Sequence, residues 1–212
     1  MIWAMVNLKG GVGKSALSVN LAAALAQPKS RVLILDLDPQ RSAAGWFLRR
    51  QQLPPQRRPI EFKVEVLSTV RSIQSLRERA HGVDYLLLDT PAFDERTASI
   101  ALELAGFAVV PLEASQTSLE ATERTLSLIT GRGVPFRIVM NRVQPGVRIG
   151  REIYERVRGQ WRGHVVKYIV HQRVEFANAD LVGRTVLESE PQGTAAKEIL
   201  AVTHELMRAS AR

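Results

Sequence analysis

The feature that most constrains the fold is a series of short, almost wholly apolar segments separated by longer segments with helical periodicity. Apolar runs of this length are typical of strands buried on both faces, which occur in parallel sheets covered by helices. Their alternation with helices predicts right-handed βαβ units and a three-layer α/β fold with a mostly parallel sheet. We expect strands over residues 2–6, 31–36, 85–89, 108–112 and 136–140, and a marginal strand near 63–67.

Helices of ordinary length are expected between and after these strands. Irregular segments, rich in proline or glycine, are expected at 51–59, 144–147 and 183–193. A chain of 212 residues falls in the usual range for one large domain, so residues 1–212 are predicted to form a single domain. The helices are predicted over 15–26, 43–52, 69–80, 97–105, 118–130, 149–158 and 195–209.

A segment rich in glycine and lysine, KGGVGKS at residues 9–15, lies directly between the first predicted strand and the first predicted helix. Glycines let consecutive N–H groups point at phosphate oxygens, and the start of a helix adds a favourable dipole. Lys14 can reach the β- and γ-phosphates, and the Ser15 hydroxyl can bind Mg²⁺. The usual phosphate-loop pattern is not fully met, because Leu8 occupies its first glycine position and Lys9 is an additional lysine.

KGGVGKS resembles the deviant Walker A motif of the ParA/MinD ATPases. The resemblance implies a P-loop NTPase fold that binds ATP and Mg²⁺, with two subunits enclosing two nucleotides face to face. It implies that Lys9 contacts the nucleotide bound by the other subunit, whereas Lys14 contacts the nucleotide bound by its own subunit. Both lysines would be catalytic groups. Ala16 stands where the family often has a second threonine, so a hydroxyl contact to the α-phosphate is lost. The nucleotide-binding residues implied are Lys9, Gly10, Gly11, Val12, Gly13, Lys14, Ser15 and Ala16.

Three carboxylates lie at or just after the ends of predicted strands, where the ligand crevice of a parallel sheet lies. The run DLDPQ at 36–40 resembles the family's switch region, which implies that Asp38 holds the catalytic water and that Asp36 supports the waters of Mg²⁺. Asp89, at the end of an apolar strand, resembles the Walker B carboxylate. Ser15, Asp36 and Asp89 are therefore the expected metal site. The alternatives are a turn-forming Asp-Pro pair at Asp38 and a structural role at Asp89.

Asn141 closes a later predicted strand. In the family, an asparagine at this place reads the adenine edge, and a side-chain amide can both donate to and accept from that base. The alternative is an asparagine that only caps the strand end.

Arginine dominates the positive charge of the chain, whose formal net charge is +8. Basic residues concentrate between 137 and 173, a composition that suits salt-dependent, sequence-independent contacts to a phosphate backbone. Arg151, Arg158 and Arg162 are spaced so that they would line one face of the predicted helix if it continued past residue 159. A solvated helix surface is the alternative. The candidate DNA contacts are Arg151, Arg158, Arg162, Arg173 and Arg184.

The chain is most similar to the small ParF-like partition ATPases and is expected to lack the N-terminal DNA-binding extension of larger relatives. The resemblance implies a cytoplasmic, nucleoid-associated homodimer that binds DNA non-specifically in its ATP state. Weak intrinsic hydrolysis would be stimulated by a centromere-binding ParB-like protein or a cargo adaptor. The sequence does not distinguish among three kinds of cargo: a plasmid, a chromosome and a protein assembly.

The main alternative is a MinD-like ATPase that cycles on a membrane through a terminal amphipathic helix. Only residues 209–212 follow the apolar stripe of the last predicted helix, so no membrane partner is expected. The N-terminal apolar run is too short for a signal peptide and no apolar run is long enough to span a bilayer, so neither a leader nor a membrane segment is expected. Because the chain contains no cysteine, an iron–sulfur ATPase resembling nitrogenase iron protein is excluded.

Overall fold

The structure is a computed structural model and describes residues 1–26, 30–67 and 73–211. In these residues, six strands form one sheet in the order β3-β2-β4-β1-β5-β6, and every pairing between them is parallel. The predicted α/β architecture is therefore confirmed, including the marginal strand β3. The strands are β1 (Ile2–Met5), β2 (Val32–Asp36), β3 (Lys63–Val66), β4 (Tyr85–Asp89), β5 (Phe107–Leu112) and β6 (Phe136–Met140).

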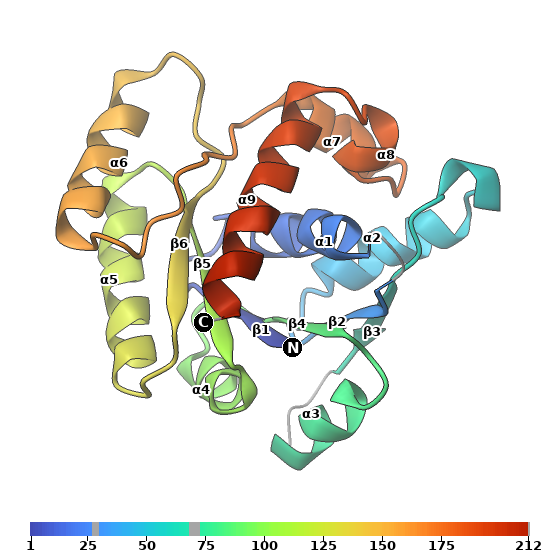
Figure 1. The fold of residues 1–212 in the computed structure, drawn as a ribbon, viewed down its shortest axis with the longest axis horizontal. Coiled ribbons are helices and arrows are strands. Elements are labelled where there is room, and N and C mark those ends of the chain that lie inside the picture. Colours follow the sequence, from blue (N-terminus) through green and yellow to red (C-terminus); the bar gives the residue numbers. More distant parts are fainter. Residues whose placement is uncertain (27–29, 68–72, 212) are drawn as a thin grey trace.

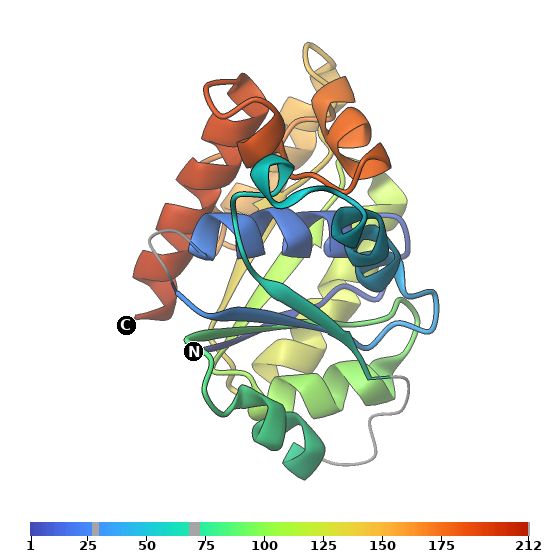
Figure 2. The same cartoon turned by 90° about the vertical axis from the view of Figure 1, so that its right-hand side faces the viewer.

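Helices cover both faces of the sheet (Figures 1 and 2). Because successive strand residues point to opposite faces, Trp3 and Met5 pack on the side of α1 and α9. Ala4 and Val6 pack on the side of α4 and α5. The helices are α1 (Lys14–Leu25), α2 (Ser42–Gln51), α3 (Ile73–Ala80), α4 (Glu95–Leu104), α5 (Gln116–Thr130), α6 (Arg148–Gln160), α7 (Val174–Leu181), α8 (Val186–Ser189) and α9 (Thr194–Ser210), and a 3-10 turn spans Pro55–Arg57.

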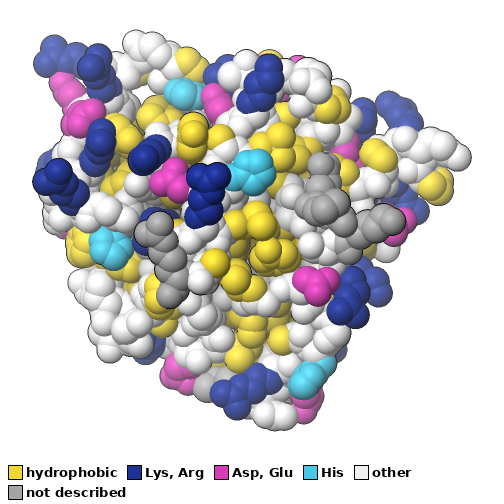
Figure 3. All heavy atoms as spheres, in the orientation of Figure 1, with side chains coloured by type: hydrophobic (Ala, Val, Ile, Leu, Met, Phe, Trp, Pro, Cys, Tyr) yellow, Lys and Arg dark blue, Asp and Glu magenta, His cyan; other side chains and the backbone are white. Residues whose placement is uncertain are grey.

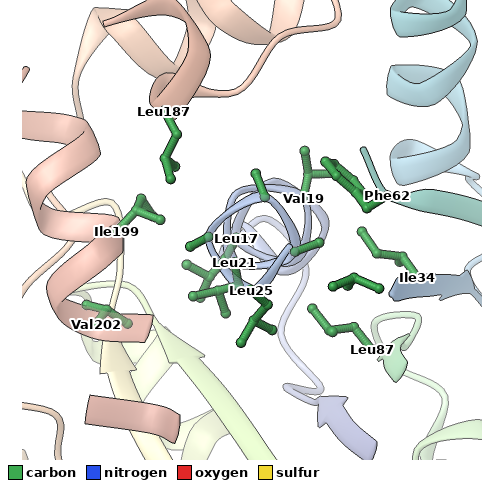
Figure 4. Packing of buried hydrophobic residues seen from close by; sticks show 14 of the residues in the cluster. Leu17, Val19, Leu21, Leu25, Ile34, Phe62, Leu87, Leu187, Ile199 and Val202 are labelled. Atoms are coloured by element: carbon green, nitrogen blue, oxygen red, sulfur yellow. The ribbon is translucent and has the colours of Figure 1, made fainter. Parts of the chain in front are cut away.

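Helix α1 lies inside the molecule, and ten of its twelve residues are buried. Figure 4, which looks along the helix axis, shows Leu17, Leu21 and Leu25 on one side of α1, toward α9, and Val19 on the other side, beside Phe62. A helix that is apolar all round is typical of this position. Its start, which carries the phosphate-binding segment, therefore rests on a rigid support.

Three predictions differ from the structure, at α6, α7 and α8, and one predicted helix lies partly outside the described residues. Residues 69–72 of the predicted helix 69–80 lie outside the described residues, and the remainder forms α3. The segment 183–193 is not irregular throughout, because it contains α8, which begins with a capping box between Thr185 and Glu188. Helix α7 was not predicted. Helix α6 ends at Gln160, so Arg162 lies beyond it.

A buried ion pair joins α2 to α8. Arg50 donates to both carboxylate oxygens of Glu188, at 2.8 and 2.7 Å, and its guanidinium lies 5.4 Å from the ring centres of Trp46 and Phe62. Burial alone would raise the pKa of Glu188, but hydrogen bonds from Arg50 and from the backbone of Thr185 outweigh it and lower that pKa. We call this group, Arg50 with Trp46, Phe62 and Glu188, the α2–α8 junction.

Candidate functional site

The phosphate loop, residues 7–13, connects β1 to α1 at the carboxyl edge of the sheet. Gly11 and Gly13 have φ angles of +80° and +82°, which residues with a Cβ rarely adopt. A Cβ on Gly13 would also lie 2.6 Å from Nδ2 of Asn141. Gly13 immediately precedes α1, and its carbonyl accepts the first helical hydrogen bond, from Leu17, at 2.9 Å. The glycines are thus required by backbone shape, as the phosphate-binding interpretation demands.

Lys14 lies beneath this loop with only 7% of its surface exposed. Its Nζ donates to the backbone oxygens of Asn7 (2.9 Å) and Lys9 (3.1 Å). Burial lowers the pKa of Lys14, and the negative charges of Asp89 and Asp38 oppose that shift. The arrangement places a buried cation inside the loop, held by two of its backbone oxygens.

Lys9 is half-buried at the outer turn of the loop. Its backbone N–H donates to Oδ1 of Asn7 at 2.8 Å, and its carbonyl receives the Lys14 ammonium. The backbone of Lys9 is therefore held from two sides.

Two carboxylates meet at adjacent strand ends, because the register of β2 with β4 places Asp36 directly opposite Asp89. Both are fully buried. The backbone N–H groups of Asp38 and Ala44 donate to Asp36 at 3.1 and 2.9 Å, yet burial raises the pKa of Asp36. Burial likewise raises the pKa of Asp89 to about 7, against the opposing effects of a hydrogen bond from Ser15 and the charge of Lys14.

These residues fit a hydrated magnesium ion. Oδ2 of Asp89 is buried and has no hydrogen-bond partner among the described residues. This suits a carboxylate oxygen that would accept a hydrogen bond from a metal-bound water. The Ser15 hydroxyl, which interacts with Asp89, would be the neighbouring oxygen ligand. The described residues contain no group of three or more His, Cys, Asp or Glu side chains able to hold a metal ion. Magnesium usually takes one or two protein oxygens together with nucleotide phosphates and water, so such a group is not needed.

Asp38 lies at the rim of this site and is half-buried. Its Oδ1 accepts the backbone N–H of Gln40 at 2.8 Å, an Asx turn of the kind that Asp-Pro sequences favour. The structure therefore places Asp38 within the same strand-end loop as Asp36, with a turn hydrogen bond on one oxygen.

Sequence reasoning missed a set of hydroxyl groups that hold the loop from α5. Nδ2 of Asn7 donates to the Pro111 carbonyl (2.7 Å) and to Oγ1 of Thr122 (2.9 Å), and the N–H of Leu8 donates to Oγ1 of Thr125 (3.0 Å). Both threonines are buried. Their three-residue spacing on the apolar face of a predicted helix was the available signal.

Asn141 is buried beside the loop, and its Nδ2 donates to the Val12 carbonyl at 2.8 Å. Arg142, which the sequence did not single out, donates from Nη1 to the Gly11 carbonyl at 2.6 Å. In this structure the Asn141 amide thus braces the phosphate loop, a contact that the adenine-reading prediction did not include.

The five candidate DNA-binding arginines fall into two groups. Arg151, Arg158 and Arg162 are exposed on and after α6, where Lys and Arg side chains gather at the upper left of Figure 3. Arg173 instead pairs with Glu198 of α9 at 2.7 Å, and Arg184 donates to the Glu188 carbonyl. Arg173 and Arg184 are half-buried and bind the protein's own groups, so the structure separates them from the exposed set.

The sheet order and the loop over a buried lysine place this chain among P-loop nucleotide-binding proteins. More specifically, it belongs to the family of the CobQ/CobB/MinD/ParA nucleotide-binding domain, whose model matches residues 3–186. Within the described residues, no helix is both long and apolar enough to cross a membrane.

Individual relatives agree with this assignment. The chain is 30% identical over 197 residues to the maintenance of carboxysome distribution protein A of Gloeobacter kilaueensis, covering 88% of each chain. It is 30% identical over 234 residues to the chromosome-partitioning ATPase Soj of Thermus thermophilus, covering 96% of this chain and 94% of Soj. Its fold matches a chain of the Aquifex aeolicus MinC:MinD cell division protein complex with a TM-score of 0.79 and 18% identity, covering 98% of this chain and 95% of that chain.

Proposed function

We propose that residues 1–212 form one ATPase domain of the ParA type, which dimerises on ATP and hydrolyses it to ADP and phosphate. The observation that carries the proposal is the KGGVGKS loop closed over the Lys14 ammonium, beside the buried pair Asp36 and Asp89. Backbone N–H groups of the loop hold the phosphates, and Lys14 neutralises charge that builds up on the β- and γ-phosphates during transfer.

The remaining roles follow from position. Ser15, Asp36 and Asp89 hold Mg²⁺ and its waters, and the ion supplies charge neutralisation on the phosphates when it is bound. Asp38, at the rim, positions the attacking water, and Lys9 extends to the nucleotide of a second subunit. Asn141, which braces Val12, contacts the adenine when the nucleotide is present. Hydrolysis thereby limits the lifetime of the dimer.

We propose that the ATP-bound dimer binds DNA non-specifically through Arg151, Arg158 and Arg162. These exposed guanidinium groups have no hydrogen-bond or ion-pair partner among the described residues, and phosphate oxygens match their geometry. The protein then acts in the cytoplasm on the nucleoid, where a ParB-like or cargo-adaptor protein stimulates hydrolysis. Partition of DNA and positioning of a protein assembly both suit this cycle, as the names of the relatives indicate for those proteins.

A MinD-like membrane cycle is the second candidate, since the MinD fold covers nearly the whole chain. The apolar face of α9 weighs against it, because Ile199, Val202 and Leu206 are buried in the core and do not face outward.

Co-sedimentation tests the two candidates directly. With ATP and Mg²⁺ the protein should pellet with duplex DNA of arbitrary sequence, and with ADP it should remain in solution. The triple variant Arg151→Ala, Arg158→Ala, Arg162→Ala should lose DNA pelleting, and the double variant Arg57→Ala, Arg96→Ala should retain it. Equal DNA affinity with ATP and ADP would refute the switch, and ATP-dependent pelleting with anionic vesicles alone would favour the membrane cycle.

A further inference from the structure

The loop after β4 contains a residue in an unusual conformation. Phe93 has a φ of +59°, in the left-handed region that aromatic residues rarely occupy because they lack a local polar group to stabilise it. Its side chain is 78% exposed, so burial of the ring does not compensate for the strain. Strained residues of this kind persist only where their surroundings impose them, and they concentrate at functional sites.

Contacts on both sides of the residue impose this conformation. The N–H of Phe93 donates to the Leu8 carbonyl at 3.0 Å. The following residue, Asp94, is held as the cap of α4, since it accepts the N–H and hydroxyl of Thr97 at 2.9 and 2.7 Å. The chain therefore leaves β4, touches the phosphate loop and enters α4 with little freedom between.

The ring of Phe93 lies over Gly10. A Cβ placed on Gly10 would be 3.3 Å from Cε2 and 3.8 Å from Cζ of the ring. Gly10 does not have a positive φ, so backbone shape does not demand glycine there. A side chain at this position would instead require the phenyl ring to shift by a few tenths of an ångström.

Phe93 thus contacts Leu8 by its backbone and Gly10 by its ring, the two residues that flank Lys9. Lys14 in turn holds the Lys9 carbonyl, at 3.1 Å. We propose that Phe93 is a positioning residue that clamps the Lys9–Gly10 segment against Lys14, so that the Lys9 side chain projects in one direction from the loop. The inference rests on the proposed ATPase function, in which Lys9 acts on the nucleotide.

Loss of the ring should loosen the segment without removing any group that binds nucleotide. For Phe93→Ala we expect partner- or DNA-stimulated ATP hydrolysis to fall about tenfold, the scale expected when a catalytic group is misplaced. The dissociation constant for ADP should change less than about twofold, because Lys14 and Gly11 to Gly13 are untouched.

The backbone and the ring can be separated. Phe93→Gly relieves the positive φ while removing the ring, so it should stabilise the fold relative to Phe93→Ala and yet remain slow in hydrolysis. Phe93→Tyr keeps the ring and should restore the rate. Leu181→Ala, which removes an equally exposed apolar side chain (74% exposed) from α7, is the matched control and should hydrolyse ATP at the wild-type rate.

The deciding measurement is amide hydrogen exchange of residues 8–11 in the nucleotide-free protein, which needs no activity. Exchange should be about tenfold faster in Phe93→Ala and Phe93→Gly than in wild type, Phe93→Tyr and Leu181→Ala. In a double-mutant cycle, Gly10→Ala should impair ADP binding in the wild-type background more than in Phe93→Ala, where the ring is gone.

The outcomes are distinct. Unchanged exchange at residues 8–11 in Phe93→Ala overturns the clamp, even if hydrolysis falls through weaker dimerisation. If wild type does not hydrolyse ATP, the proposed function fails, whereas the exchange data still decide whether Phe93 clamps the loop.

Discussion

The outward face of α6 and the α2–α8 junction use the same residue type for opposite purposes. Arg151 and Arg158 on α6 point into solvent, whereas Arg50 is 2% exposed and binds Glu188. The net charge of the chain counts all of them alike. The contrast teaches that an excess of arginine predicts a nucleic-acid surface only after the inward-facing arginines have been set aside.

Breaking the junction should have the largest effect. Arg50→Ala removes one partner of a buried ion pair and leaves Glu188 without its counter-charge, a change that costs about 3–5 kcal/mol of unfolding free energy. Urea denaturation measures this directly. The exposed control Arg158→Ala should stay within about 0.5 kcal/mol of wild type, and equal destabilisation of the two variants would erase the distinction between the regions.

Acid should weaken the junction. The folded-state pKa of Glu188 is lowered from 4.5, so its pairing stabilises the fold above the unfolded-state pKa and is lost as the pH falls through the folded-state value. Glu188→Gln cannot titrate. The difference in unfolding free energy between wild type and Glu188→Gln should therefore shrink from pH 7 to pH 3. A difference that stays constant across this range would contradict the assignment.

On α6, single arginines should affect binding and leave stability unchanged. Arg158→Ala should lower the affinity for duplex DNA in the ATP state by up to about tenfold at 0.1 M salt and reduce the slope of log K against log salt by about 0.9. Fluorescence anisotropy over a salt series measures both. A slope equal to that of wild type would remove Arg158 from the interface.

Arg173 should give the smallest effect. It pairs with Glu198, which also accepts the N–H of His171 at 3.1 Å, and its side chain is 23% exposed. Partial solvent screening limits the cost of Arg173→Ala to about 1 kcal/mol in thermal or urea unfolding. DNA affinity should remain that of wild type. A tenfold loss of DNA binding would return Arg173 to the DNA-contacting group.

Local patterns explain why the phosphate loop and the strand ends could be predicted from the sequence. Glycine spacing and an apolar strand ending in Asp89 are encoded within a few residues. The contacts that support the loop are not encoded locally, because Asn7 and Thr122 are 115 positions apart and no short pattern joins them. Helix α8 is an intermediate case, because the capping box formed by Thr185 and Glu188 is a local sequence signal but is flanked by glycines that favour a loop.

Helix α5 has a consequence for genetics. On its buried face, Thr122 and Thr125 hold the loop, and at its surface Gln116 accepts from Arg156 of α6 at 3.4 Å. Helix α5 thus contacts both the phosphate loop and α6. A screen for lost ATP turnover and a screen for lost DNA retention should therefore recover overlapping alleles in α5, while their remaining alleles fall in separate parts of the gene.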